Sequence, residues 1–248
     1  MILHRAPFVI HHFTTLRSTS DTLKSMSDAP AFTVVTADEQ IAGRGRRDRS
    51  WYSPPGDGLY LSILLRPVAP VLSPSLISLL AAIAVAETII DLGVREVDIK
   101  WPNDVLIDGR KVCGILAEGA TSGNQSSCIV IGIGVNLNQR SFPEEIAEVA
   151  TSLFLSTKET MDAARFRDHL LTNLARWYEL WHSGADLRII ERWEELSSYA
   201  KHRQVRIETE GEEVVGETIG LAGSGALLVR MADGHVRSIL AGQISHLR

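Results

Sequence analysis

The chain has 248 residues, of which 45% are hydrophobic, and its formal net charge is −5 at pH 7. That length and composition suit one large domain, or one large and one small domain, with a sizeable core. The acidic balance argues against a general nucleic-acid binder, which would carry a broad basic surface. The longest apolar stretch, 76–90, contains Glu87 and is too short to span a membrane.

The first part of the chain predicts strands separated by short helices and turns. Ser18 begins an S-x-x-D pattern typical of a helix start, so by position Ser18 and Thr19 should cap a helix that ends near residue 27. Ser73 and Pro74 should open a longer helix that is apolar on nearly all faces and stops at Gly93. The expected strands are 8–13, 32–37, 59–65, 97–101, 105–107, 111–116 and 128–137, with Asp108-Gly109 as a hairpin turn.

The composition of the chain changes at Tyr199. Before it, apolar residues at three- and four-residue spacing predict helices over 161–183 and 186–197. After it, turn signals separate four expected strands, 204–208, 213–221, 226–231 and 235–240. We therefore expect a domain of mixed helices and strands over 1–198 and a small β-barrel over 199–248.

Two features bear on the compartment. Cys113 and Cys128 lie in apolar runs without metal-ligand spacing, so we expect buried thiols in a reducing environment. The N-terminal stretch is too short and too interrupted by polar residues for the apolar region of a signal peptide. The sequence thus predicts a soluble, cytoplasmic protein.

One segment carries an unusual density of positive charge. Residues 40–51, QIAGRGRRDRSW, place four arginines within six residues, interleaved with Gly43 and Gly45 and offset only by Asp48. Glycine adds backbone freedom and adjacent like charges repel, which excludes a helix or strand interior. Guanidinium groups match carboxylate and phosphate oxygens. We call this segment the Arg loop and expect it to bind a small anion.

Several common sites are excluded by their absence from the sequence. The Gly43-x-Gly45 pair lacks the third glycine of a dinucleotide-binding turn. Neither a phosphate-binding G-x-x-x-x-G-K-[ST] loop nor a G-x-S-x-G nucleophile elbow is present. His11 and His12 are adjacent in a strand, so they point to opposite faces and cannot share a metal on one face.

Three further polar residues each admit two interpretations. Asn103, in the segment K-W-P-N-D, has an amide that suits an adenine edge, but it also suits a turn beside proline. Lys111 heads an apolar strand, where it could meet a ligand oxygen or simply be a solvated hairpin lysine. Asn136 lies inside a buried strand and must find a partner, either backbone or ligand.

The order of four segments is more specific than any one of them. Q-x-x-G-R-G-R-x-x-R-x-W, K-W-P-N-D, G-R-K-x-x-G-I-L and G-[IV]-G-V-N-L follow one another, and the chain thereby resembles the biotin protein ligase family over nearly its whole length. The resemblance implies an α+β fold: a mixed β-sheet flanked by helices, of the class II synthetase-like, biotin/lipoate ligase type, followed by a small C-terminal SH3-like β-barrel. It implies activation of biotin by ATP to biotinyl-5′-AMP, with Mg²⁺, and transfer of biotin to a lysine of a biotin carboxyl carrier protein.

The resemblance also assigns residues. Arg46 and Lys111 would be catalytic, with Lys111 bridging the biotin carboxylate and the α-phosphate. Asp104 would help to hold Mg²⁺ or the local turn, and Arg47 and Asp48 would face solvent. The biotin-binding residues would be Ser18, Thr19, Gln40, Arg44, Arg46, Lys111, Gly114 and Leu116, and those for ATP and the adenylate Arg46, Arg49, Trp51, Asn103, Lys111 and Asn136.

Further expectations concern partners and alternatives. The chain begins close to the first strand, so we expect a monofunctional form without a DNA-binding domain. Relatives can dimerise through the edge of the main sheet, so a homodimer remains open. The Arg loop should be poorly ordered without ligand. The alternative is a lipoate–protein ligase, which shares the fold and the acyl-adenylate chemistry but not the G-R-G-R loop.

Overall fold

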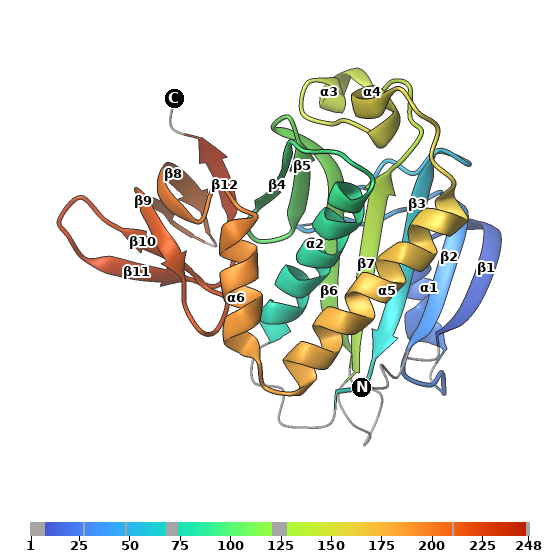
Figure 1. Ribbon diagram of the computed structural model, residues 1–248, viewed down its shortest axis with the longest axis horizontal. Coiled ribbons are helices and arrows are strands. Elements are labelled where there is room, and N and C mark those ends of the chain that lie inside the picture. The colour runs from blue at the N-terminus through green and yellow to red at the C-terminus, as the bar shows by residue number, and fades with distance from the viewer. Residues whose placement is uncertain are drawn as a thin grey trace.

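The computed structural model describes residues 8–26, 28–47, 49–67, 74–120, 128–209 and 211–246. It contains a large sheet covered by helices and a smaller sheet beside it (Figure 1). The mixed sheet flanked by helices, followed by a separate antiparallel sheet, confirms the predicted fold class.

The large sheet has seven strands in the order β1-β2-β3-β7-β6-β5-β4. β1 and β2 are parallel and every other neighbouring pair is antiparallel, so the sheet is mixed. The strands are β1 (Val9–Leu16), β2 (Thr33–Gln40), β3 (Gly58–Leu65), β4 (Val97–Lys100), β5 (Asp104–Ile107), β6 (Arg110–Ala120) and β7 (Cys128–Asn136).

The predicted strands and hairpin turn are found, with shifted ends. Asp108 and Gly109 both adopt positive φ, 50° and 73°, as a two-residue hairpin turn requires. The strand predicted over 97–101 stops at Lys100, because Trp101 begins a turn whose bond to Pro102 is cis. Ser73, predicted to open the long helix, lies outside the described residues.

Two long helices cover one face of the sheet. α2 (Pro74–Asp91) and α5 (Ala163–His182) lie side by side across it, and α6 (Asp186–Glu195) packs against α2 (Figure 1). α2 is apolar around its circumference because the sheet, α5 and α6 all contact it. α3 (Glu144–Ala147) and α4 (Leu153–Thr157) are short and were not predicted.

Glu87 is the one acidic residue in the apolar stretch of α2, and it joins three helices. Its carboxylate accepts from Trp177 Nε1 at 2.7 Å and from Arg192 Nε at 3.0 Å, and it pairs with Arg176. Trp177 and Arg176 belong to α5, and Arg192 belongs to α6. A nearly buried carboxylate needs such partners, so Glu87 fixes the helical layer rather than a ligand.

Alternation along the central strands creates the opposite face. In β3, Leu61, Ile63 and Leu65 enter the core under α2 and α5, whereas Leu64 packs in a second cluster with Leu23 of α1 (Thr19–Ser25). Side chains alternate with a period of two, so Ser62 shares the α1 face with Leu64. On the same face Gly114 of β6 and Gly132 and Gly134 of β7 carry no side chains, which leaves space above the sheet.

The C-terminal sheet has five strands in the order β11-β10-β9-β8-β12. Four strands were predicted, so the fifth is a correction: Gln243–His246 has too few apolar residues to signal a strand. The described pairings leave this sheet open between β11 and β12. Its strands are β8 (Lys201–Glu208), β9 (Glu213–Leu221), β10 (Leu227–Arg230), β11 (Val236–Ile239) and β12 (Gln243–His246).

The two sheets share one hydrophobic core. Tyr199 and strand residues such as Val205 and Leu227 belong to the same buried cluster as α2 and the large sheet. Polar contacts reinforce this packing: Trp101 Nε1 donates to the carbonyl of Gly225 at 3.3 Å, and Glu194 of α6 pairs with Lys201 at 2.6 Å. In the part of the chain that the structure covers, no helix is long and apolar enough to cross a membrane.

Candidate active site

A cavity of about 300 Å³ opens on the α1 face of the large sheet. It is bordered by β6 and β7, the Arg loop, the turn 101–104 and residues 242–244 of the C-terminal sheet. The structure brings every predicted site residue to this one cavity: Ser18, Thr19, Gln40, Arg44, Arg46, Arg49, Trp51, Asn103, Asp104, Lys111, Gly114, Leu116 and Asn136 all line it.

Two glycines form the floor under an aromatic ring. Gly114 of β6 and Gly134 of β7 are directly paired across the strands. A Cβ atom at Gly114 would lie 2.9 Å from Trp51, and one at Gly134 would overlap the indole nitrogen side of the same ring. Glycine is required at both positions, because only glycine leaves room for Trp51 on the sheet.

One end of the cavity is lined by hydroxyl and amide groups. Ser18 caps α1 by accepting from the backbone N–H of Asp21 at 3.3 Å, and it also lines the cavity, so both of its predicted roles share one position. Thr19 donates from its backbone N–H and from its hydroxyl to Gln40 Oε1, at 2.8 and 3.1 Å.

Sequence analysis did not identify two hydroxyl residues beside this group. Ser20 lines the cavity, and Ser62 is fully buried behind it, with its Oγ 2.8 Å from Thr19 Oγ1 and 2.9 Å from Ser20 Oγ. A signal was available, since Ser62 is the one polar residue in the apolar run LYLSILL.

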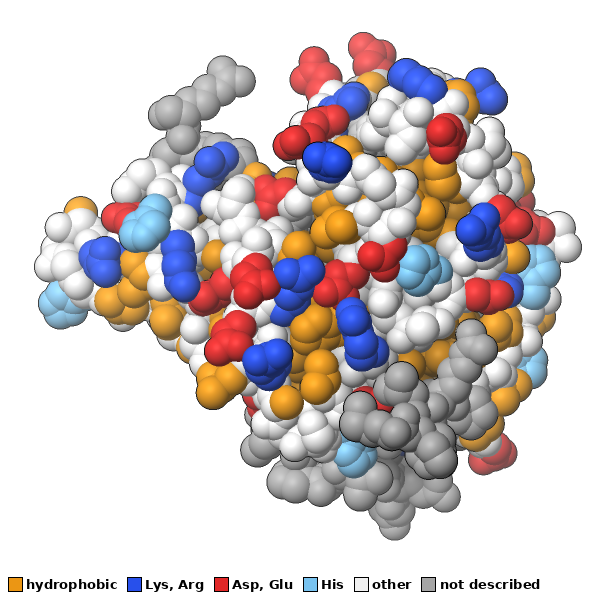
Figure 2. Space-filling view, viewed as in Figure 1, with side chains coloured by type: hydrophobic (Ala, Val, Ile, Leu, Met, Phe, Trp, Pro, Cys, Tyr) orange, Lys and Arg blue, Asp and Glu red, His pale blue; other side chains and the backbone are white. Residues whose placement is uncertain are grey.

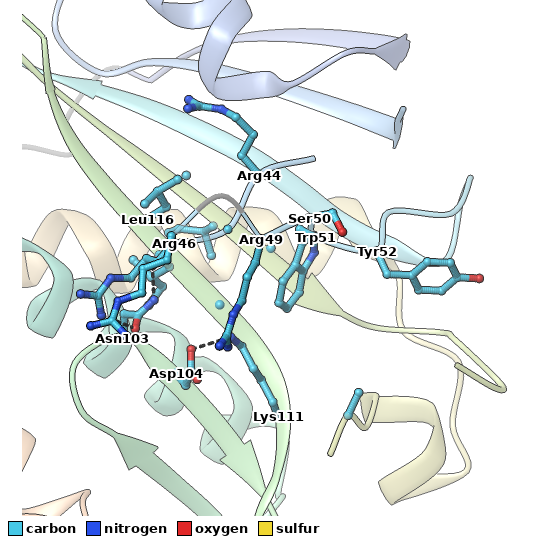
Figure 3. A pocket seen from close by; sticks show the side chains of 18 of the residues that line it. Arg44, Arg46, Arg49, Ser50, Trp51, Tyr52, Asn103, Asp104, Lys111 and Leu116 are labelled. Carbon is cyan, nitrogen blue, oxygen red and sulfur yellow. Dashed lines mark hydrogen bonds and ion pairs between the residues drawn. The ribbon is translucent and has the colours of Figure 1, made fainter. Parts of the chain in front are cut away.

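The arginines of the Arg loop point in different directions. Arg44 turns away from the other arginines (Figure 3) and pairs with Asp21 and Glu118, each at 2.8 Å. Arg46 turns inward, and its Nη1 donates to Asn103 Oδ1 at 3.2 Å. Burial lowers the pKa of Arg46, and neighbouring Arg47 lowers it further.

Arg47 departs from the expectation of a side chain that only faces solvent. It is exposed, but its Nη2 donates to the carbonyl of Glu208 in the C-terminal sheet at 2.9 Å. Its backbone adopts a positive φ of 54°. Asp48 lies outside the described residues. Arg49 lines the cavity, and no ion pair involves it within the described ranges.

Two lysines lie near one carboxylate. Lys111 Nζ is 2.6 Å from Asp104 Oδ1 and 5.3 Å from the centre of a Trp51 ring, which excludes a purely solvated hairpin lysine. Lys100 also lines the cavity, and burial lowers its pKa, with Asp104 opposing and Lys111 adding to that shift. Lys100 belongs to the K-W-P-N-D segment but was not assigned a role there.

Both asparagines have backbone partners. Asn103 Nδ2 donates to the carbonyl of Ile115 at 2.6 Å, linking the turn to β6. Asn136 Nδ2 donates to the carbonyl of Thr151 at 2.9 Å, and its oxygen accepts from Gln139 at 3.3 Å. A ligand that binds either asparagine must therefore use its remaining capacity or replace one of these contacts.

Asp104 is the only carboxylate that lines the cavity among the described residues, and no group of three potential metal ligands occurs in that part of the chain. Magnesium bound to a nucleotide commonly takes one or two protein carboxylates, with phosphate oxygens and water as its other ligands. A single carboxylate beside several cationic side chains fits that mode and does not fit a metal site formed by protein alone.

The arrangement separates two kinds of chemistry. The hydroxyl and amide end suits a neutral polar group, and the end with Arg46, Arg49, Lys100 and Lys111 suits an anion with several oxygens. Neither end supplies an activated nucleophile, since the only thiol nearby, Cys113, is fully buried and burial raises its pKa.

Comparison with known proteins shows which family the chain resembles over its two sheets. The family model of the biotin/lipoate A/B protein ligase family matches residues 12–136, and that of the biotin protein ligase C terminal domain matches residues 203–247. The bifunctional ligase/repressor BirA of Bacillus subtilis is 35% identical, with 92% of this chain and 71% of that protein covered. The biotin–[acetyl-CoA-carboxylase] ligase of Paracoccus denitrificans is 35% identical, with 79% and 83% covered.

Solved structures extend the likeness to three dimensions. The biotin protein ligase from Aquifex aeolicus in complex with biotin and ATP superposes with a TM-score of 0.85 at 29% identity, over 95% of this chain and 97% of that one. The residues that the two family models match include most of both sheets and every residue predicted for the site. The chain belongs to the biotin/lipoate A/B protein ligase family, and two of the relatives named above are biotin ligases, those of Paracoccus denitrificans and Aquifex aeolicus.

Proposed function

We propose that this protein joins biotin to ATP, giving biotinyl-5′-AMP and pyrophosphate, and then transfers biotin to a lysine of a biotin carboxyl carrier protein. The observation that carries the proposal is one cavity with neutral hydrogen-bonding groups at one end and a cluster of cations at the other. Biotin has a matching polarity, with a ureido ring at one end and a carboxylate at the other.

The first reaction needs two anions brought together. A carboxylate oxygen of biotin attacks the α-phosphorus of ATP, a P–O bond forms, and the bond to pyrophosphate breaks. Positioning and neutralisation are what the protein must provide, because both reactants repel each other and neither needs a protein nucleophile. Lys111 and Arg46 line the cavity and are the proposed catalytic pair.

Lys111 can bind a substrate anion either in place of Asp104 or together with it. In the absence of substrate its ammonium group neutralises Asp104 at 2.6 Å. An arriving carboxylate or phosphate can take one of the three ammonium donors while Asp104 keeps another. Magnesium, when bound with ATP, would neutralise phosphate charge, and Asp104 is the protein group that would hold it.

The second reaction transfers the acyl group. The neutral amine of the carrier lysine attacks the carbonyl carbon of the mixed anhydride, AMP leaves with the bonding electron pair, and the nitrogen loses a proton as the amide forms. Until then the anhydride must be kept from water. Trp51 over the Gly114–Gly134 floor, together with Leu116, supplies apolar cover for that purpose.

The polar end favours biotin over lipoate. A lipoyl ring is a disulfide-containing ring without N–H or carbonyl groups, so it would leave Ser18, Thr19 and Gln40 without ligand hydrogen bonds. Buried polar groups that lose water and gain no partner cost affinity. The relatives from Paracoccus denitrificans and Aquifex aeolicus are likewise named as biotin ligases.

The remaining assignments extend the same proposal. Residues 199–248 would act as a domain that completes the nucleotide end of the cavity, supported by Gly242, Gln243 and Ile244 in its lining. A cytoplasmic location follows from the availability of ATP and carrier protein there. The exposed edge strand β1, with Val9, Ile10 and Phe13 at its surface, is the surface through which a homodimer would form.

Mass spectrometry tests the reaction. The protein is incubated with ATP, biotin and a biotin carrier domain, and the expected product is one biotinyl group on one carrier lysine. Parallel reactions contain lipoate in place of biotin, and a carrier domain with its acceptor lysine replaced by arginine. Modification by lipoate but not by biotin would reject the proposal in favour of a lipoate ligase.

A further inference from the structure

A chain of hydrogen bonds runs through the hydroxyl groups behind the polar end of the cavity. Ser20 Oγ lies 2.9 Å from Ser62 Oγ, and Ser62 Oγ lies 2.8 Å from Thr19 Oγ1. Thr19 Oγ1 lies 3.1 Å from Gln40 Oε1. Ser62 is fully buried and Ser20 nearly so, which means that bulk water does not compete for these contacts.

One backbone group fixes the direction of every bond in this chain. The N–H of Thr19 can only donate, and it lies 2.8 Å from Gln40 Oε1, so it determines which way the Gln40 amide is turned. The amide oxygen can only accept, so the Thr19 hydroxyl donates a hydrogen bond to that oxygen. Ser62 must then donate to Thr19, and Ser20 must donate to Ser62.

The same amide sets the bonds on its other side. Gln40 Nε2 donates to Ser53 Oγ at 3.1 Å, and the Ser53 hydroxyl donates to the carbonyl of Trp51 at 3.0 Å. The hydroxyl chain is thus continuous from Ser20 to the end of the Arg loop. The acceptor of every hydroxyl group in this chain is therefore fixed.

These directions determine what remains for a ligand. The O–H of Thr19 is already used as a donor to Gln40, so its oxygen has one lone pair left to accept from a ligand. Gln40 Nε2 has one N–H left to donate. Ser18 accepts from Asp21, so its own proton stays free to donate. A urea offers N–H donors on its nitrogens and an accepting oxygen, and it therefore needs a mixture of acceptors and donors from the protein.

Resting on the proposed biotin ligase function, we propose that Ser62 is a positioning residue for ureido recognition. By donating to Thr19, Ser62 occupies one lone pair of Thr19 Oγ1, reinforces the orientation that Gln40 sets, and leaves the other lone pair to accept from a ureido N–H. Ser18 and Gln40 then donate to the ureido oxygen. Ser62 itself lies outside the lining of the cavity and acts through Thr19.

Replacing Ser62 by alanine removes this constraint. Thr19 keeps its acceptor, Gln40, but loses the donor that holds its lone pair, so one contact in place of two orients its hydroxyl. Ser20 loses its acceptor, and its hydroxyl can rotate. The loss concerns the polar end alone, because the cations that would meet ATP lie at the other end of the cavity. Biotin recognition should weaken while ATP recognition stays unchanged.

The test measures biotin-dependent exchange of pyrophosphate into ATP in four proteins: wild type, Ser62→Ala, Ser62→Thr and Thr88→Ala. Thr88 is a matched control, since its hydroxyl is also fully buried, donating to the carbonyl of Ala84 at 2.7 Å, but it belongs to α2 outside the cavity. Ser62→Ala is expected to raise KM for biotin roughly tenfold, the effect of one lost buried hydrogen bond, with KM for ATP unchanged.

The controls separate this role from a merely structural one. Ser62→Thr keeps the hydroxyl and should restore a KM for biotin near that of wild type, and Thr88→Ala should leave both KM values alone whatever its melting temperature. An unchanged KM for biotin in Ser62→Ala, or equal changes for biotin and ATP, would overturn the inference. Should Ser62→Ala fail to fold, Ser20→Ala decides, with a smaller but selective rise expected for biotin. Absence of exchange in the wild-type protein would instead refute the ligase function itself.

Discussion

Lys111 and Asp104 form an ion pair of 2.6 Å at the cavity, and they come from strands joined by a single two-residue turn. The pair holds a cation ready without leaving it unpaired beside other positive charges. Figure 3 shows both side chains close to Arg49, below the Arg loop. This relationship makes Lys111 the most direct target for testing the proposed chemistry.

Replacement of Lys111 by alanine should nearly abolish adenylation. Removing one preorganised charge donor at a reacting centre typically costs about 3–4 kcal/mol of transition-state stabilisation, or a factor of roughly 10²–10³ in rate. Pyrophosphate exchange measures the loss, and circular dichroism checks that the fold is intact. A Lys111→Ala protein that exchanges pyrophosphate at the wild-type rate would contradict the assigned role.

Replacement of Gly134 by alanine should displace Trp51. The added methyl group would overlap the indole ring, and Gly134 lies in a strand that is paired on both sides, with β3 and with β6. We expect kcat/KM for adenylate formation to fall by a factor of roughly ten or more, in line with the ~1–3 kcal/mol that overpacking costs. Gly119→Ala is the matched control, because nothing lies within 4 Å of a Cβ atom at that glycine of β6. Equal activity in the two variants would show that adenylate formation does not depend on the contact between Trp51 and Gly134.

Replacement of Arg47 by alanine should loosen the Arg loop from the C-terminal sheet. Its guanidinium donates to the carbonyl of Glu208, a contact between residues 161 positions apart. A hydrogen bond from a charged donor at an exposed site contributes about 1 kcal/mol, so KM for ATP should rise about fivefold. Arg237→Ala, which removes an exposed arginine from the same sheet, serves as the control and should change nothing. The prediction fails if both arginine variants give the same KM for ATP.

The sequence was informative where local patterns decide the structure. The apolar run 128–137 predicted strand β7, and Asp108-Gly109 predicted the hairpin turn between β5 and β6. Strand β12 was missed because Ile244 is the only strongly apolar residue in Gln243–His246, and the strand forms by pairing with β8. Its signal therefore lies in a distant partner and not in its own residues.

The site shows the same division. The resemblance named many of the polar residues that line the cavity, because the motifs fix which segments meet, but it did not include Ser20 or Lys100. The direction of each side chain depends on partners far away in the sequence: Arg44 turns to Glu118, 74 residues later, and Arg47 turns to the C-terminal sheet. The run LYLSILL marks Ser62 as unusual, but its proposed role could not be predicted, since its partners lie 42 and 43 residues away.

Charges on the helical face of the molecule do not form a single basic field. On the face seen in Figure 2, Lys and Arg side chains are interspersed with Asp and Glu over the helical layer. The concentration of cations at the cavity is therefore a local feature. Screening by salt should weaken exposed pairs more than the partly buried lysines and Arg46 in the cavity.

Lys100 provides a prediction about pH. Burial lowers its pKa below the ordinary lysine value of 10.5, and Lys111 lowers it further, while Asp104 acts in the opposite direction. A bound triphosphate favours the charged ammonium, so ATP affinity should fall as rising pH removes the proton from Lys100. KM for ATP should accordingly begin to rise at a lower pH than an unperturbed lysine would give.

In Lys100→Met, KM for ATP should be raised at neutral pH and should lose this early alkaline rise, whereas KM for biotin should stay near the wild-type value. Kinetic profiles from pH 7 upward on both proteins make the comparison, with Lys24→Met, a lysine that does not line the cavity, as the control. Superimposable ATP profiles for wild type and Lys100→Met would exclude Lys100 from the nucleotide end of the site.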